Sequence, residues 1–202
     1  MEENQLQRDL TGLVLAGGAS QRMGRDKAFL QLDGRALIEI VIERMREVCD
    51  EVIVVASDAS SYAGLGVAVA TDRFRDVGVL GGLHAGLAEA SHELTLVVGC
   101  DMPFLKPKLM RAFGGWAKSY DVVLLRHNGY VEPLHAAYRR TCLRPIETVI
   151  RAGKRRIVSF FPQVRVRYIA PQEIGSLDPQ LESFRNLNTP EEWTAVKEEW
   201  AA

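Results

Sequence analysis

The sequence predicts an α/β protein in which a mostly parallel sheet is covered by helices. In the first half of the chain, apolar runs and amphipathic segments follow one another in the order strand, helix, strand, strand, helix, strand. This order is typical of parallel strands joined by helical crossovers. The 202 residues, 47% of them hydrophobic, are enough to bury one core and too few for two independent domains. We therefore expect a single domain over residues 1–202.

The first half of the chain supplies the clearest elements. The apolar run TGLVLA predicts a buried strand at 11–16 that ends at Gly17. Hydrophobic residues recur at helical spacing over 36–48, which predicts an amphipathic helix. Further strands are predicted by EVIVVA, GVAVA and LTLVVG at 51–56, 66–70 and 94–99, and GLHAGLAEA predicts a helix at 82–90.

The second half is less regular. Helices are predicted at 106–118 and at 141–152, where Pro145 can sit in the first turn. Strands are predicted at 121–125, 130–138 and 164–170. Thr189 followed by proline predicts the start of a closing helix over 189–200, because threonine caps helix N-termini and proline fits the first turn.

The composition favours a soluble, cytoplasmic protein. A formal net charge of −1 gives no general attraction to nucleic acid or membranes, and no apolar stretch has the length of a membrane span. Cys49, Cys100 and Cys142 lie far apart and form no CxxC pair, which indicates reduced thiols rather than disulfides or a zinc site. We therefore expect neither nucleic acid nor a membrane as a partner.

The stretch LAGGASQRMGRDK, residues 15–27, is the loop that leaves the first predicted strand. Ligands bind at the carboxyl ends of strands in open α/β sheets, so this loop is expected to form part of a site. It is not a P-loop, because its glycine spacing differs and Arg25 stands at the lysine position. A glycine turn followed by Arg22, Arg25 and Lys27 suits the phosphates of a nucleoside triphosphate. The alternative is a surface loop whose charges are only solvated.

A second group of residues surrounds Asp101. The stretch VVGCDMPFL, residues 97–105, brings Asp101 to the end of a buried strand, and Pro103 prevents the strand from continuing. An aspartate there suits Mg²⁺, which binds one or two carboxylates together with phosphate oxygens. An aspartate after a strand is also a common cap or turn residue. The cationic loop expected at the same edge favours the metal.

The chain also carries LAGGASQRMGRDKAFL, GCDMPFL, VEPLHAAY and NLNTPEEW, in that order over about 11–200. Together these four stretches resemble the molybdenum cofactor guanylyltransferase family; the first alone would indicate only the wider nucleotidyltransferase superfamily. The resemblance implies a Rossmann-like three-layer nucleotidyltransferase fold (glycosyltransferase-A-like), with helices on both faces of a mostly parallel twisted sheet. It also implies a nucleotide-binding half over about 11–105 and a pterin-substrate half over about 106–202.

The activity that the resemblance implies is Mg²⁺-dependent transfer of GMP from GTP to the terminal phosphate of molybdopterin. It assigns GTP binding to Leu15, Ala16, Gly17, Gly18, Lys27, Asp72 and Asp101, catalysis to Arg22, Lys27 and Asp101, the metal to Asp101, and molybdopterin binding to Arg155, Asn186 and Asn188. Arg156 is the neighbour of Arg155 in the stretch GKRRI. Molybdoenzyme-maturation proteins are further partners that the resemblance suggests.

Two positions depart from the family pattern. Val79 follows Gly78 where the family usually has proline, which removes stiffness from a loop but no chemistry. Ser57 stands where members often have asparagine, so the contact to the base stays open.

The charge distribution is consistent with an anionic second substrate. Residues 139–167 contain nine lysines or arginines and one acid, Glu147. A pterin with a phosphate and an anionic dithiolene would suit this segment, and Arg155 or Arg156 could hold the phosphate in a bidentate grip. The alternative is a solvated basic face.

Two other functions stay open. In relatives that use CTP the first loop resembles Leu-Ala-Ala-Gly, whereas this chain has Ala16-Gly17-Gly18, which leaves room for a purine. An alternative of a different class is a scaffold that binds nucleotide and molybdopterin without catalysis. The presence of both Arg22 and Asp101 argues against it.

Overall fold

The computed structural model describes residues 9–16, 27–72, 74 and 76–201. These residues form a seven-stranded sheet in the order β5-β4-β1-β6-β8-β7-β9. The strands are β1 (Leu10–Leu15), β4 (Glu51–Ala56), β5 (Ala68–Thr71), β6 (Leu94–Gly99), β7 (Val122–His127), β8 (Tyr130–Arg139) and β9 (Val166–Ile169). Only β8 runs antiparallel to its neighbours β6 and β7, so the described sheet is mostly parallel.

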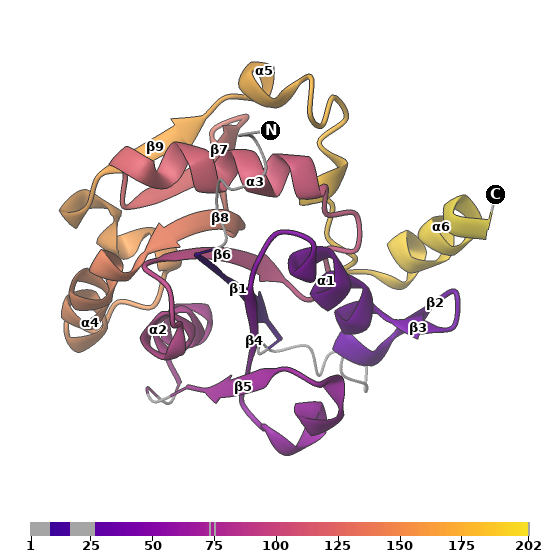
Figure 1. Ribbon diagram of the computed structural model, residues 1–202, viewed down its shortest axis with the longest axis horizontal. Coiled ribbons are helices and arrows are strands. Elements are labelled where there is room, and N and C mark those ends of the chain that lie inside the picture. Colours follow the sequence, from indigo (N-terminus) through magenta and orange to yellow (C-terminus); the bar gives the residue numbers. More distant parts are fainter. Residues whose placement is uncertain (1–8, 17–26, 73, 75, 202) are drawn as a thin grey trace.

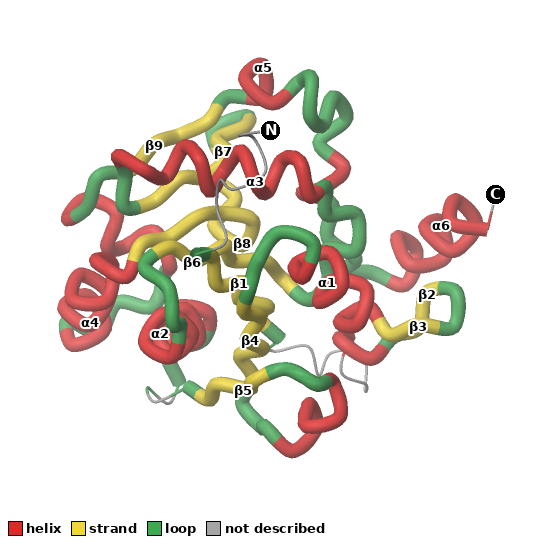
Figure 2. The backbone as a smooth tube through the Cα atoms, in the orientation of Figure 1, coloured by secondary structure: helices red, strands yellow, loops and turns green. Residues whose placement is uncertain are grey.

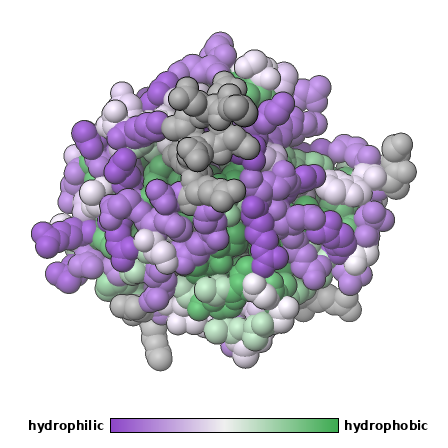
Figure 3. All heavy atoms as spheres, viewed as in Figure 1, coloured by the Kyte–Doolittle hydropathy of each residue, from purple (hydrophilic) through white to green (hydrophobic). Residues whose placement is uncertain are grey.

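Helices cover both faces of this sheet. One face carries α1 (Leu37–Arg46) and α3 (Pro107–Trp116), and the other carries α2 (Val79–Glu89) and α4 (Leu143–Arg151), so that the strands lie between two groups of helices (Figures 1 and 2). The structure therefore confirms the predicted α/β fold with three layers. The view in Figure 3 is mostly hydrophilic, with hydrophobic residues visible between the polar ones.

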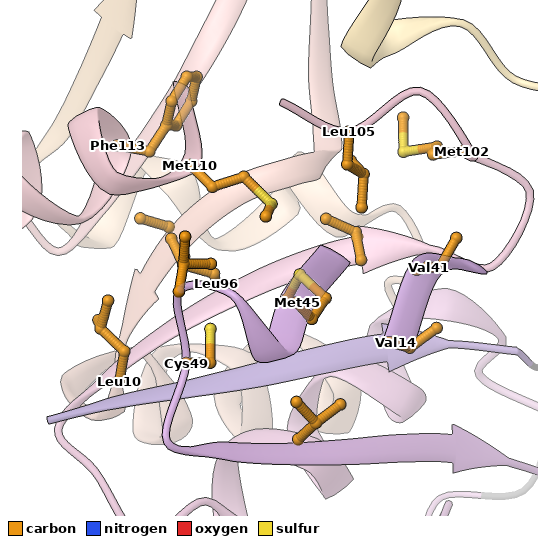
Figure 4. Packing of buried hydrophobic residues seen from close by; sticks show 14 of the residues in the cluster. Leu10, Val14, Val41, Met45, Cys49, Leu96, Met102, Leu105, Met110 and Phe113 are labelled. Carbon is orange, nitrogen blue, oxygen red and sulfur yellow. The ribbon is translucent and has the colours of Figure 1, made fainter. Parts of the chain in front are cut away.

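The core follows from the alternation of side chains along buried strands. Leu10 and Val14 of β1 belong to the cluster under α1 and α3, whereas Leu13 and Leu15 belong to the cluster under α2 and α4. Figure 4 shows the first cluster, in which side chains of β1, α1 and α3 meet. Because both faces of β1 are buried, its sequence is a continuous apolar run.

Two glycines let helices approach the central strand closely. A Cβ atom at Gly12 would stand 2.8 Å from Met45 Cε and 3.2 Å from Cys49 Sγ, so α1 can lie directly on β1. On the opposite face, Gly86 of α2 lies against Leu13 with no space for a Cβ. Helices α1 and α2 therefore pack directly against the two faces of β1.

A small peripheral unit combines an N-terminal hairpin with the C-terminal helix. β2 (Gln31–Leu32) and β3 (Arg35–Ala36) form a separate hairpin, and α6 (Pro190–Ala201) packs Val196 against Leu32 and Leu37. Figure 1 shows α6 beside this hairpin. The remaining short helix, α5 (Pro171–Ile174), follows β9. No helix of the described residues combines the length and the apolar character needed to cross a membrane.

Candidate active site

The carboxyl ends of β1, β4, β5 and β6 meet at one edge of the sheet, because these strands are parallel. Of the residues predicted for the site, Gly17, Gly18, Arg22 and Arg25 lie outside the described residues. The others fall at this edge or in a pocket that continues it, as the following paragraphs describe.

Leu15 and Ala16 are fixed where β1 ends. The Leu15 carbonyl accepts a hydrogen bond from the Cys100 amide at 3.2 Å, and the Ala16 amide donates to the Val55 carbonyl at 2.9 Å. The Tyr62 hydroxyl donates to the Ala16 carbonyl at 3.2 Å. The backbone that begins the predicted nucleotide loop is therefore held by both neighbouring strands.

Lys27, Asp101 and Asn188 come together although they are far apart in the sequence. Lys27 Nζ donates to Asn188 Oδ1 at 3.0 Å, and the Leu187 amide donates to the Asp101 carbonyl at 3.0 Å. Burial raises the pKa of the Asp101 carboxyl, the positive charge of Lys27 opposes that shift, and the negative charge of Glu192 adds to it. The half-buried Asn186 lies in the same segment, next to Leu187.

The start of α6 positions Asn188. Glu192 accepts the amides of Asn188 at 2.7 Å and Thr189 at 2.9 Å, while its own amide donates to Thr189 Oγ1 at 3.2 Å. This is the reciprocal bonding of a capping box, and it confirms that Thr189 caps the helix. The two backbone hydrogen bonds also lower the pKa of Glu192. An ionised, immobilised carboxylate thus holds the segment that contacts Lys27.

Sequence reasoning missed Glu132 as a neighbour of Asp101. Burial raises the pKa of Glu132, and the negative charge of Asp101 raises it further. Glu132 Oε1 accepts the Leu134 amide at 3.1 Å, and this stretch lies where the β7–β8 ladder shifts register. Bulges of this kind redirect side chains near functional sites. A single acid before proline in the apolar stretch YVEPLHAAY is the signal that could have identified it.

Asp72 lies directly after β5, against the first turn of α2. Asp72 Oδ1 accepts the Phe74 amide at 2.7 Å, and the carboxylate occupies the space where a side chain at Gly81 would lie. Burial raises the pKa of Asp72, while the Phe74 hydrogen bond acts in the opposite direction. The residue that the resemblance assigns to GTP therefore stands at the positive end of a helix dipole.

Arg155 and Arg156 line a pocket of about 1050 Å³ beside this edge. The first turn of α2, the start of β8, β9 and the 3-10 helix Ile157–Gln163 form its walls. Neither Asn186 nor Asn188 is among the described residues that line it. The three residues predicted to bind molybdopterin are thus divided between this pocket and the surroundings of Lys27.

Much of the basic segment 139–167 has structural contacts instead. Arg139 Nε donates to the Ala117 carbonyl at 3.1 Å, and Arg140 donates to the carbonyls of Ala88 and Ala90 at the end of α2. Arg165 Nε lies 3.2 Å from Asp121 Oδ2. The count of basic residues therefore overstates the charge available to a substrate, because these three arginines stabilise the fold.

Comparisons with known proteins show which family the chain resembles in sequence. Residues 12–166 match the family described as MobA-like NTP transferase domain. The chain is 41% identical over 185 residues to a molybdenum cofactor guanylyltransferase from Desulfosudis oleivorans, covering 91% of this chain and 92% of that protein. It is 39% identical to a probable molybdenum cofactor guanylyltransferase from Pelotomaculum thermopropionicum, with 89% and 88% covered.

A solved structure extends the likeness to three dimensions. The molybdopterin-guanine dinucleotide biosynthesis protein A from Archaeoglobus fulgidus superposes with a TM-score of 0.83 at 28% sequence identity. The superposition covers 95% of this chain and 98% of that one. The similarity in fold therefore extends over nearly the whole chain.

Proposed function

The chain belongs to the molybdenum cofactor guanylyltransferase family, and from this premise we propose that it transfers GMP from GTP to the terminal phosphate of molybdopterin. The products are the guanine dinucleotide form of the cofactor and pyrophosphate. The observation that carries the proposal beyond the family is the group of Lys27, Asp101 and Asn188 at the carboxyl edge of the sheet. Its cation and half-buried carboxylate lie at the carboxyl ends of parallel strands, the part of an α/β sheet that commonly binds ligands.

The reaction needs positioning and charge more than proton transfer. A phosphate oxygen of molybdopterin forms a bond to the α-phosphorus of GTP, and the bond from that phosphorus to the β-phosphate oxygen breaks. A phosphate monoester has a second pKa of about 6, so the attacking oxygen is mostly deprotonated at pH 7 and needs no general base. We assign stabilisation of the developing charge to Lys27 and Arg22.

The residues present fit Mg²⁺ as a partner of the nucleotide. Asp101 offers a half-buried carboxylate, and Glu132 offers a second one whose charge interacts with it. No group of three or more His, Cys, Asp or Glu suited to a metal occurs among the described residues. Mg²⁺ commonly takes one or two carboxylates and completes its shell with phosphate oxygens and water. When bound, it would neutralise part of the triphosphate charge.

We assign the nucleotide contacts to the edge and the acceptor to the neighbouring pocket. Leu15, Ala16 and Asp72 would contact GTP, together with the glycines that follow Ala16. Arg155 would meet the acceptor in the pocket. The position of Asn188 beside Lys27 suits the phosphate groups, where both substrates meet.

Localisation and partner proteins are also part of the proposal. Cys49 and Cys142 are buried free thiols, which suits a reducing compartment such as the cytoplasm. Molybdoenzyme-maturation proteins are the partners expected to receive the dinucleotide product.

Pyrophosphate release tests the function. Purified protein is incubated with molybdopterin and GTP, with CTP in place of GTP, and with each substrate alone, in Mg²⁺ or in EDTA. Release that requires GTP, molybdopterin and Mg²⁺ supports the proposal. Release with CTP would assign the chain to the cytidylyl reaction, and tight GTP binding without any release would indicate a scaffold.

A further inference from the structure

The acceptor pocket contains an arginine that neither the sequence nor the resemblance singled out. Arg126 lies at the carboxyl end of β7, and its Cζ atom stands 3.6 Å from the centre of the Tyr168 ring on β9. Both residues line the pocket that Arg155 and Arg156 also line. A guanidinium at this distance from the ring centre makes a cation–π contact.

The backbone around Arg126 is well defined. β7 and β8 are joined by the two-residue turn Asn128-Gly129, with φ angles of 49° and 79°. Positive φ at both central residues is typical of the type I′ turn that fits the twist of a hairpin. On the other side, the parallel register pairs Leu124 with Tyr168. A tight turn and a neighbouring strand therefore hold the backbone on either side of Arg126.

The lining of the pocket indicates the chemistry of its ligand. Three arginines and two tyrosines line it, and no acidic residue is found among its described lining residues. Tyr130 is 81% exposed, which is unusual for a large aromatic side chain. Most other lining residues are aliphatic or aromatic, such as Val131 and Phe161. An anionic molecule that contains a flat ring satisfies both the cations and the aromatic surface.

We propose that the Arg126–Tyr168 pair is a specificity-determining element for the acceptor, on which the pterin ring system of molybdopterin stacks. The inference rests on the proposed function and deepens it. The Arg126 guanidinium lies over the Tyr168 ring and the residue is exposed, so the guanidinium can also contact a flat, anionic ligand. Arg155 and Arg156 supply further positive charge for the anionic groups of the acceptor.

The position of the pocket suits a ligand whose ring lies on Arg126 and whose phosphate points toward Asp101. Its wall includes Val131 and Pro133, which flank Glu132, and Glu132 lies close enough to Asp101 for the two charges to interact. It also includes Gly78 in front of α2. A ligand whose ring lies on Arg126 can therefore extend its phosphate along β8 toward the nucleotide edge.

Variants of the pair separate acceptor binding from nucleotide binding. Arg126→Ala and Tyr168→Ala are each expected to raise the KM for molybdopterin about tenfold, with kcat and the KM for GTP unchanged. Tyr168→Phe keeps the ring and is expected to behave like the wild type. The matched control is Arg144→Ala, since Arg144 is an exposed arginine of α4 outside the pocket lining. Thermal melting verifies that each variant is folded.

A double variant tests whether the two residues act as one element. If Arg126 works through its contact with Tyr168, the double alanine variant loses little more acceptor affinity than either single variant. Unchanged molybdopterin KM in both single variants, while the wild type makes the dinucleotide, would overturn this inference and leave the proposed function intact. A wild-type protein that forms no dinucleotide from GTP would overturn the proposed function, and the inference with it.

Discussion

Replacing His135 with leucine is expected to reduce the loss of stability that accompanies mild acidification. His135 is buried on β8 between the rings of Phe113 and Phe184, whose centroids lie 5.5 Å and 4.4 Å from the imidazole. Burial lowers the pKa of His135 from 6.5 to about 4, although the negative charge of Asp178 opposes the shift. Neither ring nitrogen has a geometrically well-formed hydrogen bond to the described residues.

The size of the effect follows from proton linkage. A histidine whose folded pKa is depressed contributes its full stability above the unfolded pKa and loses it as the pH falls toward the folded pKa. With values of 6.5 and about 4 for the two states, the loss is about 2 kcal/mol between pH 7 and pH 5. Leucine has a similar volume and does not titrate, so the variant lacks this contribution.

Urea denaturation at pH 7, 6 and 5 measures the difference. The free energy of unfolding is extrapolated to zero urea for both proteins at constant ionic strength. Carboxylates with lowered pKa also lose stabilisation in acid, but they do so in both proteins and cancel in the comparison. The wild type is expected to lose about 2 kcal/mol more than His135→Leu between pH 7 and pH 5. Equal losses would refute the claim that the fold keeps His135 neutral.

Three further variants address the nucleotide edge. Asp101→Asn is expected to abolish Mg²⁺-dependent turnover and to keep the melting temperature, because the amide fills the same space; normal activity would remove Asp101 from the metal site. Lys27→Ala should weaken GTP binding or turnover far more than Lys118→Ala, since Lys27 contacts the segment beside Asp101, and equal losses in the two would contradict this role. Gly81→Ala displaces the Asp72 carboxylate and should raise the KM for GTP about tenfold with little change in melting temperature; an unchanged KM would exclude Asp72 from GTP binding.

The buried elements could be predicted from the sequence because burial on both faces produces continuous apolar runs. The predicted strands at 51–56 and 94–99 coincide with β4 and β6. The helix predicted at 82–90 begins earlier, at Val79, so that Gly81 and Gly82 lie inside α2. Glycine pairs are common helix breakers. Here the contact with Asp72 accounts for a glycine at position 81.

Other elements depend on contacts that local pattern does not contain. The hairpin of β2 and β3 has only two residues in each strand, and it forms because Leu32 packs against α6 and α1. The 3-10 helix Ile157–Gln163 contains Pro162 and is held by Phe160 and Phe161, which pack in the core cluster under α2 and α4. Such short segments depend on packing for their stability.

In the candidate site, too, local sequence pattern predicts some residues, whereas others depend on contacts between distant segments. Asp101 could be located because it directly follows a recognisable strand, and Lys27 because it ends a glycine-rich loop. The contact between Lys27 and Asn188 joins residues 161 positions apart, which no spacing rule reveals. Arg126 and Tyr168 come from different strands and meet through the register of β7 and β9. The position of Glu132 near Asp101 depends on a register shift between β7 and β8 that the sequence pattern does not show.

In the proposed function, the reversed direction of β8 separates the nucleotide contacts from the acceptor contacts at one edge of the sheet. β1, β5 and β6 finish at the edge that we assign to the nucleotide, whereas β8 enters from the Asn128-Gly129 turn and brings its first residues to the pocket that we assign to the acceptor. Changes in that turn alter the rim of the acceptor pocket and leave β1 and its helices untouched. For protein engineering, this hairpin and β9 are the segments to diversify in a search for new acceptors, while the phosphate chemistry is inherited unchanged.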